Sequence, residues 1–240
     1  MAEQEIINHT KKAISVWGRD GHSLWHKIKE FASEIFIIVF AISLSISFHN
    51  WSEHKAEQKQ VKVFLLGLKQ DIQQDIYDTK QIIQQYKYYD TQYTFLAGLN
   101  KLVQPNKDSL HLFIASINSN VYLRPHKSRF DGFISSGKML TIESDSLVSD
   151  ILRYYQENIP AIKSSESGWL STQTKLLNFI ADNIEDPDND AGYFNLLCNP
   201  RGKYLCKHLI PWQQIYDRYS NFIELGQAII KQIDSGYPEK

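Results

Sequence analysis

Glycine, proline and cysteine are all scarce in this chain of 240 residues, which holds 11 glycines, 7 prolines and 2 cysteines. Glycine and proline weaken helices and mark turns, so their scarcity beside plentiful glutamine and lysine favours helix over sheet. We therefore predict an all-α fold. The part of the chain that follows residue 51, about 190 residues, is long enough to bury a core of its own.

A strong excess of charge of either sign is also missing. Lysine and arginine together number 26, aspartate and glutamate number 27, and the formal net charge is −1. Domains that bind nucleic acid generally carry a clear basic patch, so we expect no nucleic-acid partner. The same balance excludes a strongly acidic surface.

Recognisable catalytic and cofactor motifs are absent: the sequence has no P-loop, no dinucleotide fingerprint, no H-E-x-x-H and no Ser-His-Asp set. Asp71 and Asp75 lie one helical turn apart, and such like charges are mildly unfavourable unless a cation lies nearby. No partner group for a paired-carboxylate site is evident beside them. We therefore expect no enzyme activity, no cofactor and no metal.

One long apolar run is present, at residues 35–48, with no charge and no helix breaker. Extended to residues 31–51 it would span about 31 Å as a helix, roughly the hydrocarbon thickness of a bilayer. We interpret it as a single transmembrane anchor. The alternative is a buried helix of a soluble protein, but a run that is apolar on all sides finds no comparable partner elsewhere in this chain.

Five residues near the ends of this run are predicted to lie at the membrane interface. Trp25 and Trp51 suit the headgroup level, and Glu34 would lie near one interface, where a charge costs far less than at mid-bilayer. Asn50 and Glu53 lie in the first helical turn expected to be in water. There they need do no more than end the anchor and set its depth in the membrane. A cleaved signal peptide is disfavoured because no small-x-small site follows and the run begins late.

The two cysteines, Cys198 and Cys206, form a lone close pair in the sequence. In a chain with a membrane anchor, such a pair favours a disulfide in an oxidising compartment, while two free thiols in a cytosolic domain are the alternative. A metal site that adds His208 would lack a fourth ligand. We predict the disulfide.

Orientation depends partly on that disulfide, because the lysines and arginines near the two ends of the anchor are almost equal in number. We expect residues 1–30 to form a tail in the cytoplasm, residues 31–51 to span the membrane, and residues 52–240 to form a helical domain outside the cytoplasm. A following domain can be translocated largely regardless of its own charge, so its lysines do not oppose this orientation.

A long amphipathic helix is predicted to continue from the anchor. No proline occurs between Trp51 and Pro105, and apolar residues from Val61 to Ile76 recur at close to the α-helical period. A helix of about 45 residues, packed as the first helix of a bundle, accounts for this pattern. A dimeric coiled coil or signalling helix is the alternative, but the repeat is not a strict heptad.

Shorter helices are predicted from caps and apolar stripes. Ser144 or Asp145 can cap one helix, Gly137 can end another, and Pro160 can begin a third. Polar turns are expected at residues 185–189 and 199–202. The predicted helices cover residues 108–117, 130–137, 144–155, 160–180 and 211–233.

Three motifs together resemble a bacterial family of small single-pass membrane proteins of unknown function. Residues 34–44 read E-I-x-I-x-x-x-A-I-x-L, residues 50–53 read N-W-x-E, and residues 65–75 read L-x-x-L-x-x-D-I-x-x-D. A later F-x-x-x-x-S-S-G-K piece from Phe130 also fits, whereas the serine-rich second half of the anchor and His49 depart from the family pattern. The resemblance implies an anchor in the bacterial inner membrane and a helical domain in the periplasm. It implies no known activity and no catalytic residues.

Two functions fit these features. The leading hypothesis is a non-enzymatic, membrane-anchored helical domain that binds a protein partner or assembles with itself in the bacterial envelope. The alternative is a sensor domain with a small-molecule pocket among its many tyrosine and tryptophan residues. Besides the lipid bilayer, the expected partner is thus another protein or a second copy of this chain.

Overall fold

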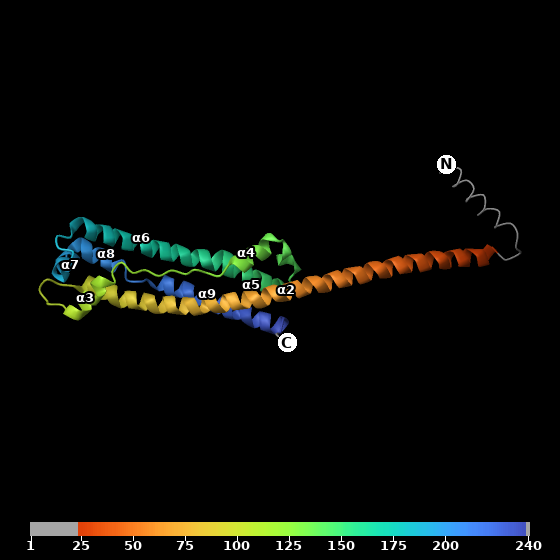
Figure 1. The fold of residues 1–240 in the computed structure, drawn as a ribbon, viewed down its shortest axis with the longest axis horizontal. Helices are drawn as coiled ribbons and strands as arrows, with labels where there is room; N and C mark the ends of the chain where they lie inside the picture. The colour runs from red at the N-terminus through yellow and green to blue at the C-terminus, as the bar shows by residue number, and fades with distance from the viewer. Residues whose placement is uncertain (1–23, 239–240) are drawn as a thin grey trace, which may run out of the picture. The chain divides into compact units, whose positions relative to one another are not determined.

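The computed structural model describes residues 24–238, and the predicted tail at residues 1–30 lies mostly outside this range. The described residues form helices and connections with no strand, which confirms the all-α prediction (Figure 1). The chain divides into two compact units, one ending at Ala56 and one beginning at Glu57. The elements in chain order are α2 (Leu24–Gly98), α3 (Lys107–Ala115), α4 (Ser128–Ser135), the short 3-10 helix η1 (Lys138–Thr141), α5 (Asp145–Leu152), the π-helix η2 (Arg153–Asn158), α6 (Ile159–Asn183), α7 (Asp190–Leu197), α8 (Pro200–Lys207) and α9 (Gln213–Gly236).

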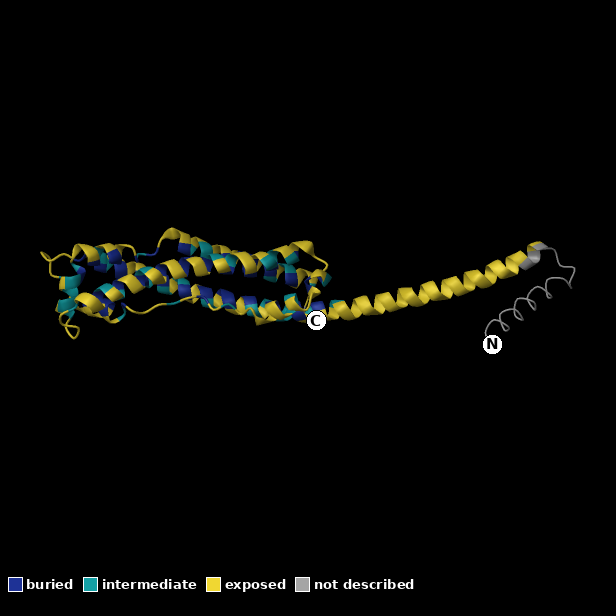
Figure 2. Ribbon diagram, turned by 90° about the horizontal axis from the view of Figure 1, so that it is seen from above, coloured by how far each residue is buried: buried dark blue, intermediate teal, exposed yellow. Residues whose placement is uncertain are grey.

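In the first unit, the described residues belong to the beginning of α2. Their large apolar side chains are exposed, from 45% at Leu44 to 71% at Trp25, and Figure 2 shows this stretch exposed throughout. Among the described residues, α2 is the one helix long and apolar enough to cross a membrane, and none of its apolar window is buried. Ser47 donates a hydrogen bond to the Ser43 carbonyl at 2.8 Å, so this polar side chain is satisfied within the helix.

In the second unit, the rest of α2 buries the predicted stripe. Val61, Leu65, Leu68 and Ile72 are at most 1% exposed, which confirms the helical period read from the sequence. The stripe is wider than predicted. The additional buried apolar positions on α2 are Phe64, Ile82, Tyr89 and Leu96.

Aromatic rings from three helices form the centre of this core around Trp169 of α6. Tyr89 of α2 stacks on the Trp169 ring at a centroid distance of 4.9 Å, and Tyr86 meets it edge-on at 5.7 Å. Tyr219 of α9 lies 5.8 Å from Tyr86. Large rings that interlock in this way bring α2, α6 and α9 into one bundle.

The helix predicted to begin at Pro160 instead continues from α5 without a break. Pro160 occupies the first turn of α6, and the π-helix η2 joins α5 directly to it. Proline cannot donate the backbone hydrogen bond of a helix interior, and its ring clashes with the carbonyl four residues back. A π-helical turn before the proline accommodates both effects, which the sequence pattern alone did not reveal.

Caps define most of the shorter helices. The Ser144 hydroxyl accepts from Leu147 N, as predicted, and Gly137 follows α4 with φ of +71°, the left-handed conformation expected of a terminating glycine. Asn106, rather than Asp108 or Ser109, caps α3. The turn predicted at residues 199–202 is instead the start of α8, because Asn199 caps it and Pro200 occupies the first turn.

Candidate functional site

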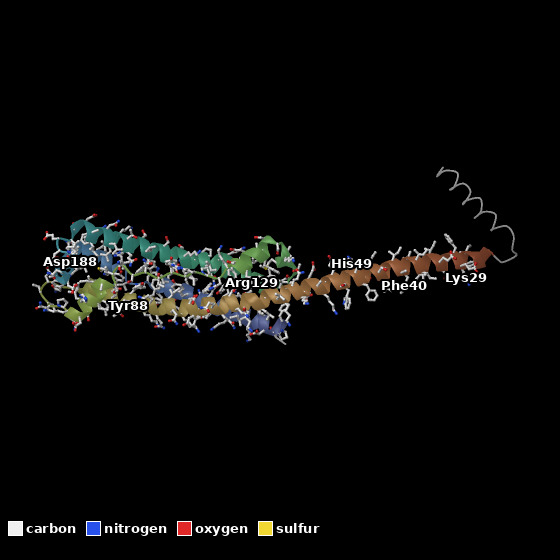
Figure 3. All side chains as sticks on the ribbon, in the orientation of Figure 1. Lys29, Phe40, His49, Tyr88, Arg129 and Asp188 are labelled. Carbon is white, nitrogen blue, oxygen red and sulfur yellow. The ribbon has the colours of Figure 1, made fainter. Side chains whose placement is uncertain are left out.

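The residues predicted for the membrane interface lie along the exposed part of α2. Trp25 is 71% exposed and Trp51 is 56% exposed, while Lys55 Nζ lies 4.0 Å from the centroid of the Trp51 ring. Glu34 and Asn50 are also exposed, and Glu53 lies 3.9 Å from His49. Figure 3 shows the side chains of this stretch, His49 among them, projecting from a helix that no other element covers. Their place at a membrane interface stays a prediction.

The predicted disulfide is absent: Cys198 and Cys206 are both free thiols. Cys198 ends α7, whereas Cys206 lies near the end of α8 and is completely buried. The connection between the cysteines, predicted to be a turn, is the first part of α8.

Asp71 and Asp75, for which the sequence indicated no partner, are each paired in the structure, Asp71 with Arg129 and Asp75 with His126. Arg129 donates from Nε to Asp71 at 3.0 Å. Asp75 is buried, and its Oδ1 accepts from the backbone N of His126 at 2.9 Å and contacts the ring Nδ1 at 2.7 Å. Because Arg129 and His126 lie more than 50 residues along the chain, no local pattern could have indicated them.

Burial and hydrogen bonding act on the protonation of this pair. Burial raises the pKa of Asp75 above its ordinary value, although the hydrogen bonds and the charge of His126 oppose this rise. The hydrogen bond to Asp75 is the main cause that raises the pKa of His126. A hydrogen bond of 3.4 Å from the Tyr155 hydroxyl to the His126 carbonyl adds a contact from η2.

The contact at His126 is one of several that hold the connection between α3 and α4, residues 116–127, which we call the crossing segment. Figure 1 shows this segment running lengthwise beside α6. Gln173 donates to the carbonyls of Ile117 and Ser119 at 3.1 and 2.7 Å. Glu166 Oε1 accepts from Leu123 N at 2.7 Å and from the Tyr219 hydroxyl at 2.6 Å.

These contacts explain why polar side chains are buried in the core. Where the backbone of a segment without regular secondary structure is buried, its polar groups need hydrogen-bond partners from elsewhere. Asp75, Glu166 and Gln173 are each at most 8% exposed, and each supplies such a partner. The buried acids therefore stabilise the conformation of the crossing segment. Within residues 24–238, no group of three or more His, Cys, Asp or Glu side chains is placed to hold a metal ion.

The crossing segment is extended where it passes along α6. Ser119 is bound to Gln173 and Leu123 to Glu166, and these two side chains are seven residues apart on α6. Seven residues of helix rise about 10.5 Å, a distance that four residues cover only when nearly extended. Leu123 is buried while its neighbours Tyr122 and Arg124 are exposed, in the alternation of an extended chain.

A groove with a volume of about 490 Å³ lies between the crossing segment and α6. Its apolar lining residues are Val121, Leu123, Pro125, Trp169 and Leu170, of which Leu170 is 42% exposed while Leu123 and Trp169 are buried. The charged side chains that line it are Arg124, Lys127, Lys163 and Glu166. The sequence did not indicate this groove, because its walls come from segments about 40 residues apart that only the hydrogen bonds of the crossing segment bring together.

A second groove, with a volume of about 690 Å³, lies among α3, α7 and the connection at residues 99–106. Leu102 and Val103, at its edge, are 91% and 63% exposed. Phe194 of α7 and Pro105 also line it. We call Leu102 and Val103 the apolar tip of the bundle.

Comparison with known proteins identifies a family but no activity. The sequence model of a family of unknown function, DUF6090, matches residues 34–197, which is more than half of the chain. This agrees with the resemblance read from the sequence at the level of a family without a known function. No curated protein and no solved structure matches the chain.

Proposed function

Because the chain belongs to the DUF6090 family of unknown function, no activity follows from its relatives, and we propose a function from its geometry. We propose that the chain is a non-enzymatic, membrane-anchored helical domain that binds a protein partner or a second copy of itself. The apolar tip is the contact surface in this proposal. The anchor would lie in the bacterial inner membrane, with residues 1–30 in the cytoplasm and the helical domain in the periplasm.

The exposed first part of α2 supports the membrane anchor. Apolar side chains from Ile35 to Phe48 are about half exposed or more, and no described residue covers them. A continuous exposed apolar surface of this size marks a membrane or a protein interface. A helix satisfies its own backbone hydrogen bonds, so a bilayer can cover this stretch at no further cost to its backbone.

The observation that carries partner binding is the exposure of Leu102 and Val103. Their connection contains Pro105 and lies beside a groove that Leu110 and Phe194 also line, so the two side chains are at the surface next to a concave region of mixed polar and apolar lining. Single exposed apolar residues are ordinary, but two adjacent ones next to such a groove are typical of a surface that another protein covers.

Photocrosslinking in membranes tests this proposal. A photoreactive amino acid would replace Leu102 in the full chain, and the matched control would replace Tyr77, which is 59% exposed on α2. We expect a defined protein adduct at Leu102 and none at Tyr77, and mass spectrometry of the adduct distinguishes a partner from a second copy. The double variant Leu102→Asp with Val103→Asp should lose complex formation by the purified components. No adduct at Leu102 above that at Tyr77 would contradict the proposal.

A second candidate function is a small-molecule sensor, and the groove between the crossing segment and α6 favours it. Its volume of about 490 Å³ lies within the range of known ligand sites. A sensor of this kind would show a rise in melting temperature when its ligand binds, because a ligand that binds only the folded state stabilises that state.

A further inference from the structure

Two cations line the groove beside the crossing segment without an acid paired to them. Within residues 24–238, neither Arg124 nor Lys163 forms a salt bridge, whereas Lys127 pairs with Asp131 at 3.0 Å. Arg124 donates to the Tyr122 hydroxyl and lies over its ring, a contact that leaves its charge uncompensated. An anion that enters the groove would therefore meet two available positive charges.

The single acid in the lining does not offset this charge at the groove surface. Glu166 is only 8% exposed, and its Oε1 accepts hydrogen bonds from Leu123 N and the Tyr219 hydroxyl beneath the crossing segment. Burial raises the pKa of Glu166, while the nearby charge of Lys163 lowers it. The carboxylate thus holds the wall of the groove in place, whereas Arg124 and Lys163 are exposed.

The apolar residues that line the groove are also held in fixed positions by the fold. Trp169 is buried beneath this lining, and its indole is fixed by its hydrogen bond to the Leu209 carbonyl at 2.9 Å and by the tyrosine rings around it. Leu170 is 42% exposed on the next position of α6. A preformed apolar surface with a few polar groups at its edge is the usual composition of a small-molecule site.

We propose that this groove binds a small organic anion, with its carboxylate on Arg124 and Lys163 and its apolar body against Leu170 and Pro125. Arginine offers a planar fork that fits a carboxylate, and lysine adds a mobile point charge. Only the biological role of this binding rests on the proposed sensor function. Its ligand class follows from charge complementarity and from the groove volume of about 490 Å³.

The test uses the full chain in nanodiscs and ligand-observed saturation-transfer NMR, with empty nanodiscs as the blank for partition into lipid. The probes are phenylacetate, indoleacetate and isovalerate, each compared with the primary amide and the amine of the same skeleton. We expect at least one carboxylate to bind saturably and about tenfold or more tightly than its amide, with no binding of the amine. If no carboxylate binds more tightly than its amide, the proposal is overturned.

Variants locate the binding. Lys163→Glu and Arg124→Glu should each weaken carboxylate binding by about tenfold or more, because each reverses a charge in the groove. Lys175→Glu is the matched control, since Lys175 is exposed on the same helix and does not line the groove, and it should leave binding unchanged. Equal losses in all three variants would show that net charge and not the groove is responsible, and would overturn the proposal.

The same measurement separates this inference from partner binding at the apolar tip. The variant Leu102→Asp with Val103→Asp should bind the carboxylate as the unaltered chain does, because neither residue lines this groove. A chain that forms its protein complex but shows no preference for carboxylates would retain the proposed function and lose the anion site. Loss of carboxylate binding in the tip variant would contradict the assignment to this groove.

Discussion

Cys206 shows how burial determines the chemistry of a single residue in this fold. Its side chain is completely buried in the bundle, and burial raises the pKa of its thiol to about 12. Only the thiolate is an effective nucleophile, so such a thiol is inert at neutral pH even when it is reduced. Cys198 is partly exposed, and burial raises the pKa of its thiol as well.

Thiol alkylation of the native chain should therefore modify Cys198 slowly and leave Cys206 unmodified, whether or not a reductant is added first. After denaturation both cysteines should react without reduction, and mass spectrometry of the peptides reads the outcome. Two cysteines that stay blocked in the denatured chain until they are reduced would instead establish the disulfide.

The Asp75–His126 pair makes stability depend on pH. The pKa of His126 is raised in the folded chain, so its contribution is fully present below its ordinary pKa of 6.5 and is lost as the pH rises through the folded value. The raised pKa of Asp75 acts in the same direction, because the folded chain again holds the proton more tightly. Rising pH therefore removes stability at both groups.

We expect the melting temperature of the helical domain, in the full chain, to fall by roughly 2 °C between mildly acidic and mildly basic pH. Asp75→Asn should flatten this slope, since the amide no longer raises the pKa of His126. Asp131→Asn removes an exposed acid that pairs with Lys127 and should keep the slope. A slope that is unchanged in Asp75→Asn would assign the pH dependence to other groups.

Among the elements, the crossing segment depends most on side chains from distant parts of the chain. It has no regular hydrogen bonds of its own between Ser119 and Pro125, and Glu166 supplies the partner for Leu123 N. Removal of one partner leaves a buried donor unsatisfied, which costs more than a normal hydrogen bond contributes.

Glu166→Ala should accordingly lower the free energy of unfolding by roughly 2–4 kcal/mol, because Leu123 N and the Tyr219 hydroxyl both lose their acceptor. Glu166→Gln keeps an oxygen in the same place and should cost less than about 1 kcal/mol. Denaturant unfolding followed by circular dichroism measures both, and hydrogen exchange at the Leu123 amide should accelerate in the alanine variant alone. Similar losses in the two variants would show that the charge and not the acceptor matters.

Local signals predicted most of the helices and few of the contacts. The stripe from Val61 to Ile76, the cap at Ser144 and the terminator at Gly137 depend on neighbours within a few residues, so the sequence alone indicates them. The partners of Asp75 and Glu166 depend on how a connection without secondary structure crosses the bundle. No sequence periodicity predicts the course of this connection, and for the same reason the sequence did not predict the groove beside it.

At the scale of the whole molecule, two exposed apolar surfaces of residues 24–238 carry the proposed function. One is the exposed apolar stretch of α2, which lies in the first unit, and the other is the apolar tip of the helical domain. The buried polar residues, by contrast, are engaged with the fold itself. The proposed anchoring and partner binding rest on these two exposed surfaces.

The central claim is that residues 31–51 lie in lipid with the helical domain outside the cytoplasm, and one labelling experiment tests it most directly. Single cysteines would replace Lys29, Ala41 or Glu57 in a chain with Cys198→Ser and Cys206→Ala, and a membrane-impermeant maleimide would be applied to cells with the outer membrane opened. We expect the cysteine at residue 57 to be labelled at once, the one at 29 only after the inner membrane is permeabilised, and the one at 41 only after denaturation. Labelling at residue 41 in native membranes would contradict the anchor, and the opposite order at 29 and 57 would contradict the orientation.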